Sequence, residues 1–409
     1  MRNKIYVLKF GGTSIANIKR INYVANCIYS YVKKGYGLVV VVSAMGDTTD
    51  NLIRLARKIN PCPSEREIDM LISTGEQISV SLLAMALHKR KLDAISLVGH
   101  QVGIITDTKH TKAKILKIKT ERIKKEVNEG KVVIVAGFQG MTAHNEITTL
   151  GRGGSDLSAV AIAVSLNARM CEIYTDVEGV YTADPRIVPA ARKIKCITFD
   201  EMLELASRGA QVMQTRAIEV AKRFNIPLHV RSSFNKKEGT IIMGKIPYIE
   251  EPMVRGITLM ENEIKITIRN VPDKPGIAAY IFTQLASGDI NVDMIVQNIS
   301  HKHTTDISFT IPKSSINKVR KISSRVIKRI GAESVVTDEN IAKVSVVGVG
   351  MKTHPGVAAK CFHALAKNKI NIEMISTSEI SISCVVKKKM GKKALRILHK
   401  TFGLGKLSG

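Results

Sequence analysis

Two short glycine-rich segments combine a cation, paired glycines and hydroxyl groups, which are groups that hold phosphate. Lys9-Phe-Gly-Gly-Thr-Ser14 and Gly151-Arg-Gly-Gly-Ser-Asp156 each follow an apolar, strand-like run and precede a helix-like segment. Glycines let backbone N–H groups approach an anion closely, and a following helix directs the positive end of its dipole toward it. Lys9 and Arg152 each add a full charge. The pattern predicts phosphoryl-transfer chemistry, with Gly11 and Gly12 against the phosphates.

Neither segment is a Walker A loop. The order Gly-x-x-x-x-Gly-Lys-Ser/Thr is absent from both segments and from the rest of the chain. An alternative interpretation is that the Gly-Gly pairs merely end strands. Two loops with matched basic and hydroxyl partners favour phosphate binding over that alternative.

The composition indicates an ordinary globular protein of two or three domains. The chain has 409 residues, 44% of them apolar and 24% charged. Its six cysteines are scattered without a Cys-x-x-Cys pair, so we predict no disulfide framework, no zinc site and a reduced, cytoplasmic location. Lys9 interrupts the first apolar run too early for a signal peptide, and no run approaches the ~18 residues that a membrane span needs.

The formal net charge of +27 raises the question of nucleic-acid binding. The lysines are spread over residues 109–131, 313–329 and 387–393, without interleaved aromatic residues, which total 4%. In the first of these segments Ile115, Ile118, Ile123 and Val127 supply an apolar face, so we interpret its lysines as the solvated side of a helix. We therefore expect no nucleic-acid partner, and no membrane partner either.

The first half of the chain alternates strand and helix signals, which predicts an α/β fold with a mostly parallel sheet and helices on both faces. Expected strands are 5–8, 38–42, 132–136, 171–174 and 227–230, and expected helices are 156–167 and 200–208. Catalytic loops of such sheets lie at the carboxyl ends of strands. Residues 9–14, 43–50, 137–140 and 175–181 directly follow strand-like runs, so we expect them to form one cleft.

The composition changes near residues 236–252, and an internal repeat follows. Asp273-Lys-Pro-Gly-Ile-Ala-Ala aligns with Thr353-His-Pro-Gly-Val-Ala-Ala, and Ile290-Asn-Val-Asp-Met294 with Ile370-Asn-Ile-Glu-Met374, at a constant offset of 80 residues. Each copy predicts a βαββαβ module that pairs with the other copy or across a dimer. The expected organisation is a catalytic domain at 1–245, a linker and first regulatory strand at 246–263, and modules at 264–340 and 341–409.

Six segments closely resemble the aspartokinases (aspartate kinases), which have the amino-acid kinase fold. They are 9–14, Ser43-Ala-Met-Gly-Asp-Thr-Thr-Asp50, Ser73-Thr-Gly-Glu-Gln77, Val135-Ala-Gly-Phe-Gln-Gly140, Thr149–Asp156 and Tyr174–Arg186. The repeat resembles the paired regulatory ACT domains of the same family. The resemblance covers nearly the whole chain and implies a three-layer kinase domain. It also implies a monofunctional enzyme that uses ATP with Mg²⁺ to phosphorylate L-aspartate at its side chain.

The resemblance also assigns residues to roles. Arg152 would bind the α-carboxylate of aspartate, Glu76 would meet its ammonium, and Asp156 would orient Lys9. The catalytic residues would be Lys9, Asp156 and Arg152. The substrate-binding residues would be Ser43, Thr49, Glu76, Arg152 and Ser155. The ATP-binding residues would be Lys9, Gly11, Gly12, Thr175, Asp176, Tyr181, Arg186 and Gln211. We predict no protein-bound metal site. An ordinary ion pair between Glu76 and Arg152 is the alternative structural interpretation.

One position departs from the family pattern. A lysine that reaches toward the nucleotide is expected where this chain has Gln211, and an amide cannot neutralise phosphate charge. We expect either weaker ATP binding, or compensation for the missing charge by Arg216 or by one of the lysines.

The ACT pair implies feedback by an amino acid, with threonine, lysine or both as effectors. The effector-binding residues would be Asp273, Gly276, Ala278, Asn291, Gln297, Asn371, Ile372, Ser378 and Glu379. A homo-oligomer formed through the ACT modules is expected, and a shorter regulatory subunit from an internal start is a further option. Two alternatives stay open: a non-catalytic amino-acid sensor with a decayed kinase half, and a kinase for an N-acylated glutamate. Retention of Lys9, Glu76, Arg152 and Asp156 argues against the first, and the ACT pair argues against the second.

Overall fold

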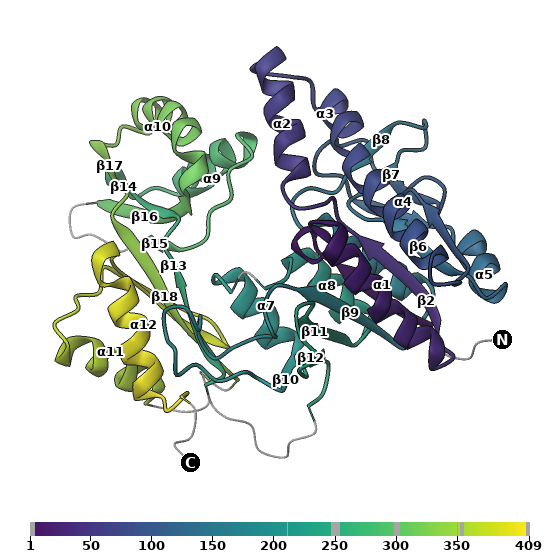
Figure 1. Cartoon of the computed structure of the whole chain (residues 1–409). Helices are drawn as coiled ribbons and strands as arrows, with labels where there is room; N and C mark the ends of the chain where they lie inside the picture. Colours follow the sequence, from purple (N-terminus) through teal and green to yellow (C-terminus); the bar gives the residue numbers. More distant parts are fainter. Residues whose placement is uncertain are drawn as a thin grey trace. The chain divides into compact units, whose positions relative to one another are not determined.

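The computed structural model describes residues 5–210, 212–246, 254–297, 303–349, 351 and 356–405 (Figure 1). The chain divides into two compact units. The first unit contains residues 1–180, 193–207 and 211–249, and the second contains residues 181–192, 208–210 and 250–409.

The first unit is built on an eight-stranded sheet with the order β10-β12-β11-β9-β1-β2-β6-β3. Its strands are β1 (Ile5–Phe10), β2 (Gly37–Val42), β3 (Ala94–Leu97), β6 (Val132–Ala136), β9 (Met170–Thr175), β10 (Cys196–Thr198), β11 (Leu228–Ser232) and β12 (Thr240–Met243). All pairs are parallel except β11 with β12. The central strands β2 and β6 are buried at every residue, which their runs of β-branched side chains allow. The predicted, mostly parallel sheet is confirmed.

Helices cover both faces of this sheet. On one face α1 (Ile18–Lys33) and α4 (Thr74–His88) pack against each other and share a core with β1, β2 and β6. On the other, α5 (Glu121–Asn128), α6 (Gly154–Ser165) and α8 (Thr215–Phe224) pack on the sheet or on one another, and α7 (Phe199–Ser207) packs on α8. Two further helices, α2 (Thr48–Ile59) and α3 (Glu65–Ile72), connect β2 to α4.

A second, small sheet in this unit has the order β5-β4-β7-β8 and consists of β4 (Ile104–Thr106), β5 (Ile115–Ile118), β7 (Gln139–Met141) and β8 (Ile147–Thr149). The expectation of one helix through residues 109–131 is therefore wrong in its first half. Only α5 is helical, and Ile115 and Ile118 lie in a strand that pairs with β4. A three-residue spacing fits a helix face, but pairing with a distant strand decided the local structure.

The stretch Glu65–His88 is long and apolar enough to span a membrane by composition. Half of its apolar window is nevertheless buried inside the unit, as in the core helix of a globular domain. Its hydrophobicity is explained by the packing of α4 on the main sheet.

The second unit contains two modules of helices on four-stranded antiparallel sheets. The first module has β14 (Glu263–Pro272), α9 (Ile277–Ser287), β15 (Ile295–Gln297), β16 (Thr304–Pro312), α10 (Ile316–Ile330) and β17 (Ser334–Asp338), in the sheet order β15-β16-β14-β17. It therefore has the predicted βαββαβ order. A short 3-10 turn, Lys313–Ser315, precedes α10.

The second module has β18 (Ile341–Val347), α11 (Val357–Lys367), β19 (Met374–Thr377), β20 (Ser381–Lys387) and α12 (Gly391–Thr401), with a 3-10 turn at Lys388–Met390. Its fourth strand is β13 (Gly256–Met260), which precedes the first module in the chain and pairs with β18. The first module is thus inserted between the two parts of the second. The 80-residue offset extends to the helices, because α9 begins at residue 277 and α11 at 357.

The segment 181–192 belongs to the second unit although it lies between β9 and β10 in sequence. Thr182 is buried, and its hydroxyl lies 2.9 Å from His399 Nε2 of α12 and donates to the carbonyl of Leu404. Arg396 of α12 donates to the carbonyl of Ile187. Contacts with α12 therefore fix the segment 182–187, which comes shortly after the loop at residues 176–180.

Candidate active site

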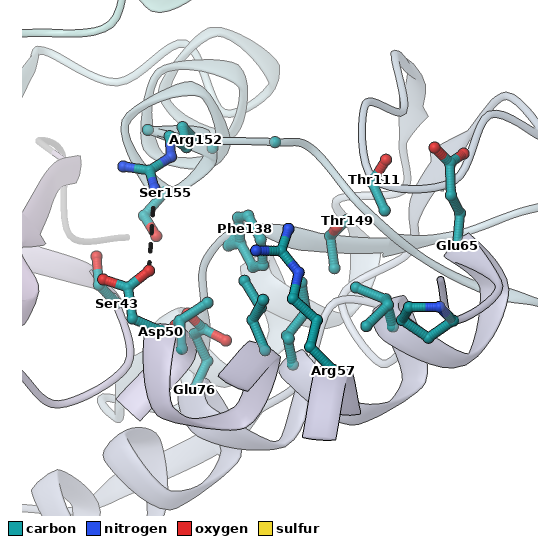
Figure 2. Close-up of a pocket in the computed structure, with 18 of the residues that line it drawn as sticks. Ser43, Asp50, Arg57, Glu65, Glu76, Thr111, Phe138, Thr149, Arg152 and Ser155 are labelled. Atoms are coloured by element: carbon teal, nitrogen blue, oxygen red, sulfur yellow. Dashed lines mark ion pairs between the residues drawn. The ribbon is translucent and has the colours of Figure 1, made fainter. Parts of the chain in front are cut away.

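A pocket of about 630 Å³ lies at the carboxyl ends of β1, β2 and β6 (Figure 2). Six of the predicted site residues line it, from four different parts of the first unit: Lys9, Ser43, Thr49, Glu76, Arg152 and Ser155. The second glycine-rich loop contributes Gly151, Gly153 and Gly154 to the same wall. The parallel order β9-β1-β2-β6 brings these segments to one sheet edge.

Lys9, which lines the pocket, forms an ion pair with Asp156. Lys9 is on β1 and Asp156 is in the first turn of α6, with Nζ 2.6 Å from Oδ1. Their side chains are only 11% and 10% exposed. Each charge offsets the desolvation of the other, and the ammonium is held in one orientation.

The glycines of both loops are also required by packing. A Cβ on Gly12 would lie 2.8 Å from the carbonyl oxygen of Ala44, and one on Gly154 would lie 2.8 Å from Leu150 Cβ. Gly153 has φ 71° and caps α6, a conformation that favours glycine. The first loop differs from the expectation, because it continues as a 3-10 turn at Gly12–Ile15 and α1 begins only at Ile18.

Glu76 is the most deeply buried carboxylate that lines the pocket. It lies in the first turn of α4 and is 2% exposed, and its Oε1 accepts a hydrogen bond of 2.9 Å from the N–H of Ala44. Its Oε2 is buried and makes no hydrogen bond to the residues that the structure describes. Burial raises the pKa of Glu76 to about 8. A buried carboxyl oxygen without a donor is a site for a ligand cation.

Arg152 has the opposite character. Its side chain is 99% exposed at the mouth of the pocket, with Nη2 3.9 Å from Asp50 Oδ1 (Figure 2). Glu76 and Arg152 therefore do not form the ion pair that was the alternative interpretation. The guanidinium is available to a carboxylate that enters the pocket.

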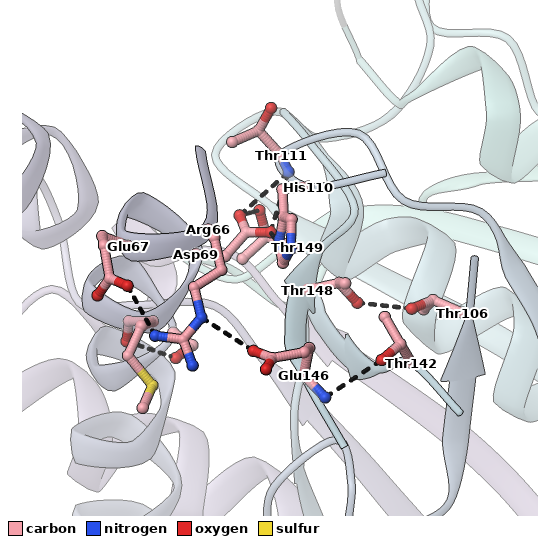
Figure 3. A network of polar contacts seen from close by, with 12 residues as sticks. Arg66, Glu67, Asp69, Thr106, His110, Thr111, Thr142, Glu146, Thr148 and Thr149 are labelled. Carbon is pink, nitrogen blue, oxygen red and sulfur yellow. Dashed lines mark hydrogen bonds and ion pairs between the residues drawn. The ribbon is translucent and has the colours of Figure 1, made fainter. Parts of the chain in front are cut away.

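Sequence reasoning missed Asp69, which supports one wall of the pocket (Figure 3). This buried carboxylate of α3 accepts from the Thr149 hydroxyl at 2.5 Å, from the Thr111 N–H at 3.0 and 3.1 Å, and lies 2.9 Å from His110 Nδ1. Thr111 and Thr149 both line the pocket. The one available signal was an acidic residue next to the apolar positions Ile68 and Ile72 of the same helix.

Gln214 was also missed, and it braces the second glycine-rich loop. Its Nε2 donates to the Arg152 carbonyl at 2.9 Å, and its N–H lies 3.4 Å from Asp156 Oδ2. Arg216 donates to the carbonyls of Leu150 and Ala113, so its guanidinium supports the same loop. Gln211, predicted to contact the nucleotide, lies outside the described residues.

The other predicted nucleotide residues fall in two groups. Thr175 ends β9 and Asp176 follows it. Ser233 N–H donates to the Thr175 carbonyl, and the Ser14 hydroxyl donates to Ser233 Oγ at 2.8 Å. These bonds join the first glycine-rich loop to the ends of β9 and β11. Tyr181 and Arg186 belong to the second unit, where Tyr181 packs on the core of the second module. Arg186 binds Asp184 and lowers the pKa of that carboxyl.

The predicted effector residues are only partly brought together. A pocket of about 330 Å³ at the start of α9 is lined by Asp273, Gly276, Ala278 and Gln297. Gly276 caps α9 with φ 92°. Asn291 does not line this pocket. Asn371 and Ile372 precede β19, and Ser378 and Glu379 follow it. The equivalent Pro-Gly turn of the second module begins at residues 352–355, outside the described residues.

Comparisons with known proteins indicate the same family along nearly the whole chain. The amino acid kinase family model matches residues 4–232, and an ACT domain model matches residues 264–323 and 344–402. An aspartate kinase of Pseudomonas putida is 49% identical over 401 residues, 98% of each chain. The crystal structure of E. coli aspartokinase III in complex with aspartate and ADP (R-state) has a TM-score of 0.83 at 26% identity, covering 97% of this chain and 99% of that one. The lysine and aspartate complex (T-state) of that enzyme has a TM-score of 0.75 at the same identity and coverage.

Proposed function

The chain belongs to the aspartate kinases, amino acid kinases with ACT domains, and on this premise we propose that it transfers the γ-phosphoryl group of ATP to the side-chain carboxylate of L-aspartate. The product would be 4-phospho-L-aspartate. The observation that carries the proposal is one pocket lined both by Lys9, whose ammonium pairs with Asp156, and by Glu76, whose Oε2 makes no hydrogen bond to the described residues.

Two residues that line the pocket suit the two charged groups on the α-carbon of aspartate. Glu76 Oε2 would accept from the α-ammonium, and the exposed Arg152 guanidinium would bind the α-carboxylate in bidentate fashion. Ser43, Thr49 and Ser155 supply hydroxyl groups on the walls in between. A buried carboxylate for a free ammonium disfavours an N-acylated substrate, whose amide nitrogen carries no charge.

The reaction requires little covalent chemistry from the protein. An oxygen of the aspartate side-chain carboxylate, already an anion, attacks the γ-phosphorus, and the bond from that phosphorus to the ADP oxygen breaks. Lys9, oriented by Asp156, would neutralise charge on the transferring phosphoryl group, and Gly11 and Gly12 would lie against the phosphates. Arg152 would act by positioning the attacking carboxylate.

ATP would enter between the first glycine-rich loop and the end of β9, where Thr175 and Asp176 are placed. Tyr181, Arg186 and Gln211 would complete this nucleotide site. Mg²⁺ carried with the nucleotide would neutralise phosphate charge.

The second unit would sense an amino acid. The pocket at the start of α9 offers backbone N–H groups for a carboxylate, and Asp273 and Gln297 as polar partners for an ammonium. Threonine, lysine or both would act there. We expect homo-oligomers through the modules, since β15 and β19 are edge strands whose Ile295 and Ile375 are exposed. The enzyme would open lysine, threonine and methionine synthesis in the cytoplasm.

A coupled ATP assay with L-aspartate tests the proposal, with N-acetyl-L-glutamate as the competing acceptor. Lysine and threonine are then added singly and together. Aspartate-dependent ADP formation is the expected result. Amino-acid binding without any ADP formation would instead identify a non-catalytic sensor.

A further inference from the structure

The two modules of the second unit meet through positions that the internal repeat makes equivalent. Met294 and Met374, 80 residues apart in the repeat, lie in one small buried cluster with Ile341 and Val385. An acid directly precedes each methionine, Asp293 in the first module and Glu373 in the second. The interface therefore has an approximate internal twofold relationship.

Each of these acids forms an ion pair with a lysine of the other module. Asp293 contacts Lys343 on β18, and Glu373 Oε2 lies 2.6 Å from Lys265 Nζ on β14. Lys343 is completely buried and also lies 3.0 Å from Glu263 Oε1. A buried ammonium must stay paired, and Asp293 and Glu263 both supply a carboxylate to it.

The ion pair with Arg208 distinguishes Asp293 from the equivalent acid Glu373. Its Nη1 lies 2.9 Å from Asp293 Oδ1, and its side chain is only 15% exposed. The second lysine on Glu373 is Lys387, which comes from the same module as Glu373. Of the two equivalent acids, Asp293 thus pairs with a cation from the segment between α7 and α8, whereas the ion pairs of Glu373 stay within the modules.

Close packing restrains the backbone of the segment that carries Arg208. Arg208 directly follows the end of α7, and Gly209 has φ 113° with its absent Cβ position 3.0 Å from the Leu259 carbonyl of β13. Residues 208–210 therefore pack in the second unit, and Gln211 follows them in the chain. Residues 208–210 thus connect Arg208, which pairs with Asp293, to Gln211, a position assigned to the nucleotide.

We propose that Asp293 is a positioning residue for nucleotide binding: its carboxylate, shared by Lys343 and Arg208, holds residues 208–210 in place directly before Gln211 in the chain, and couples them to the arrangement of the two modules. The inference rests on the proposed function for the role of Gln211. Asp293 also lies two residues after Asn291 and four before Gln297, which lines the effector pocket. An effector that prefers another arrangement of β15 would displace Asp293, and thereby weaken nucleotide binding.

The repeat supplies a matched control for the test. Asp293→Asn keeps the side-chain size and leaves Lys343 paired with Glu263, whereas Glu373→Gln makes the same change at the equivalent acid. Arg208→Gln removes the link and leaves the Lys343 cluster complete. Binding of Mg-ADP is measured by calorimetry on the full-length chain, together with KM for ATP, KM for aspartate, and inhibition by lysine and threonine.

We expect Asp293→Asn and Arg208→Gln to weaken Mg-ADP binding about fivefold or more, within the usual range of coupling between sites. KM for ATP should rise in parallel, KM for aspartate should stay within about twofold, and the effector should still bind but inhibit less. Glu373→Gln should leave nucleotide binding within about twofold. A merely structural role would move both KM values together.

Equal shifts in Asp293→Asn and Glu373→Gln, or unchanged Mg-ADP binding in Arg208→Gln, would overturn the inference. If Asp293→Asn does not fold, Arg208→Gln decides the question alone. Mg-ADP binding needs no turnover, so a wild-type protein that binds ADP without phosphorylating aspartate refutes the proposed function and leaves this comparison decisive. A wild-type protein that does not bind Mg-ADP refutes both.

Discussion

The ammonium of Lys9 lies 2.6 Å from the carboxylate of Asp156, and both side chains are about nine-tenths buried. Lys9 lies near the end of β1 and Asp156 in the first turn of α6, so the ion pair joins the two glycine-rich segments that the sequence separates by more than a hundred residues. The charge on Lys9 is thereby kept in place before any phosphate arrives. Preorganised charge of this kind is effective because it costs no reorganisation during the reaction.

Loss of either partner should therefore reduce turnover more than it reduces substrate binding. We expect Lys9→Ala and Asp156→Ala to lower kcat by ~10²-fold or more, because they remove or misplace a charge that acts on the transition state. Steady-state kinetics with ATP and aspartate provide the measurement, with circular dichroism to verify folding. Asp156→Asn, which keeps the shape, is the control for packing. Normal turnover in Lys9→Ala would show that this loop does not hold the transferring phosphoryl group.

Arg152 should behave differently, because its side chain is exposed and its ion pair within the described part of the chain is a loose one, 3.9 Å from Asp50. Arg152→Ala should raise KM for aspartate by about tenfold or more, the loss expected for a charge-assisted contact to a carboxylate. The free energy of unfolding should hardly change. Arg57→Ala, at an exposed arginine that lines the same pocket, is the matched control. Equal effects of the two substitutions would indicate general attraction of anions.

Gln211 stands where the family resemblance leads us to expect a lysine. Gln211→Lys should tighten apparent ATP binding by about 1 kcal/mol, the scale of a partly exposed charge-assisted hydrogen bond. The guanidinium of Arg216, the other candidate for this charge, donates to two backbone carbonyls. KM for ATP provides the measurement. An unchanged or raised KM would remove Gln211 from the nucleotide site.

The parts of the fold that could be predicted are those set by neighbouring residues. Apolar runs followed by glycine or polar residues located β1, β2, β6 and β9, because burial and turn chemistry act within a few residues. The edges of the site depend on pairs far apart in sequence. Asp69 and Thr149 are 80 residues apart, and Gln214 and Arg152 are 62 apart, so no local pattern reveals them.

Strand pairing explains the other places where the structure differs from what the sequence predicts. Ile115 and Ile118 have a spacing that suits a helix, but they lie in β5 because β4 pairs with it. The sheet of the second module includes β13, which precedes the first module in the chain. β13 pairs with the edge of β18 opposite β20. Periodicity identifies the elements of the repeat but not the chain segment that completes each sheet.

The effector pocket at α9 gives a prediction about regulation. Gln297→Ala should relieve inhibition by threonine or lysine and leave uninhibited turnover nearly intact, because Gln297 lines that pocket in the second unit. Inhibition curves with each amino acid alone and with both together provide the measurement. Ser378→Phe, at the turn after β19, should act in the same direction if the second module also binds an effector. Unchanged inhibition in both variants would place the sensor elsewhere.

Glu76 gives a pH-dependent prediction, because its raised pKa of about 8 is caused mainly by burial. In the unliganded protein the folded state binds this proton more tightly than the unfolded chain does. The stabilisation is therefore complete below about pH 4.5 and is lost as the pH rises through about 8. Glu76→Gln cannot ionise, so its melting temperature should fall less between pH 6 and 9 than that of the wild type.

Substrate binding should show the opposite trend. The ammonium of aspartate favours the ionised form of Glu76, so KM for aspartate should fall as the pH rises from 6.5 to 8.5. Glu76→Gln should remove this slope and raise KM by roughly 10- to 100-fold, the value of a hydrogen bond to a charged group. Calorimetry in buffers of different ionisation enthalpy should detect a proton released on binding to the wild type near pH 7 and none in the variant. A KM that is independent of pH in the wild type, with no proton release, would show that Glu76 does not meet the ammonium.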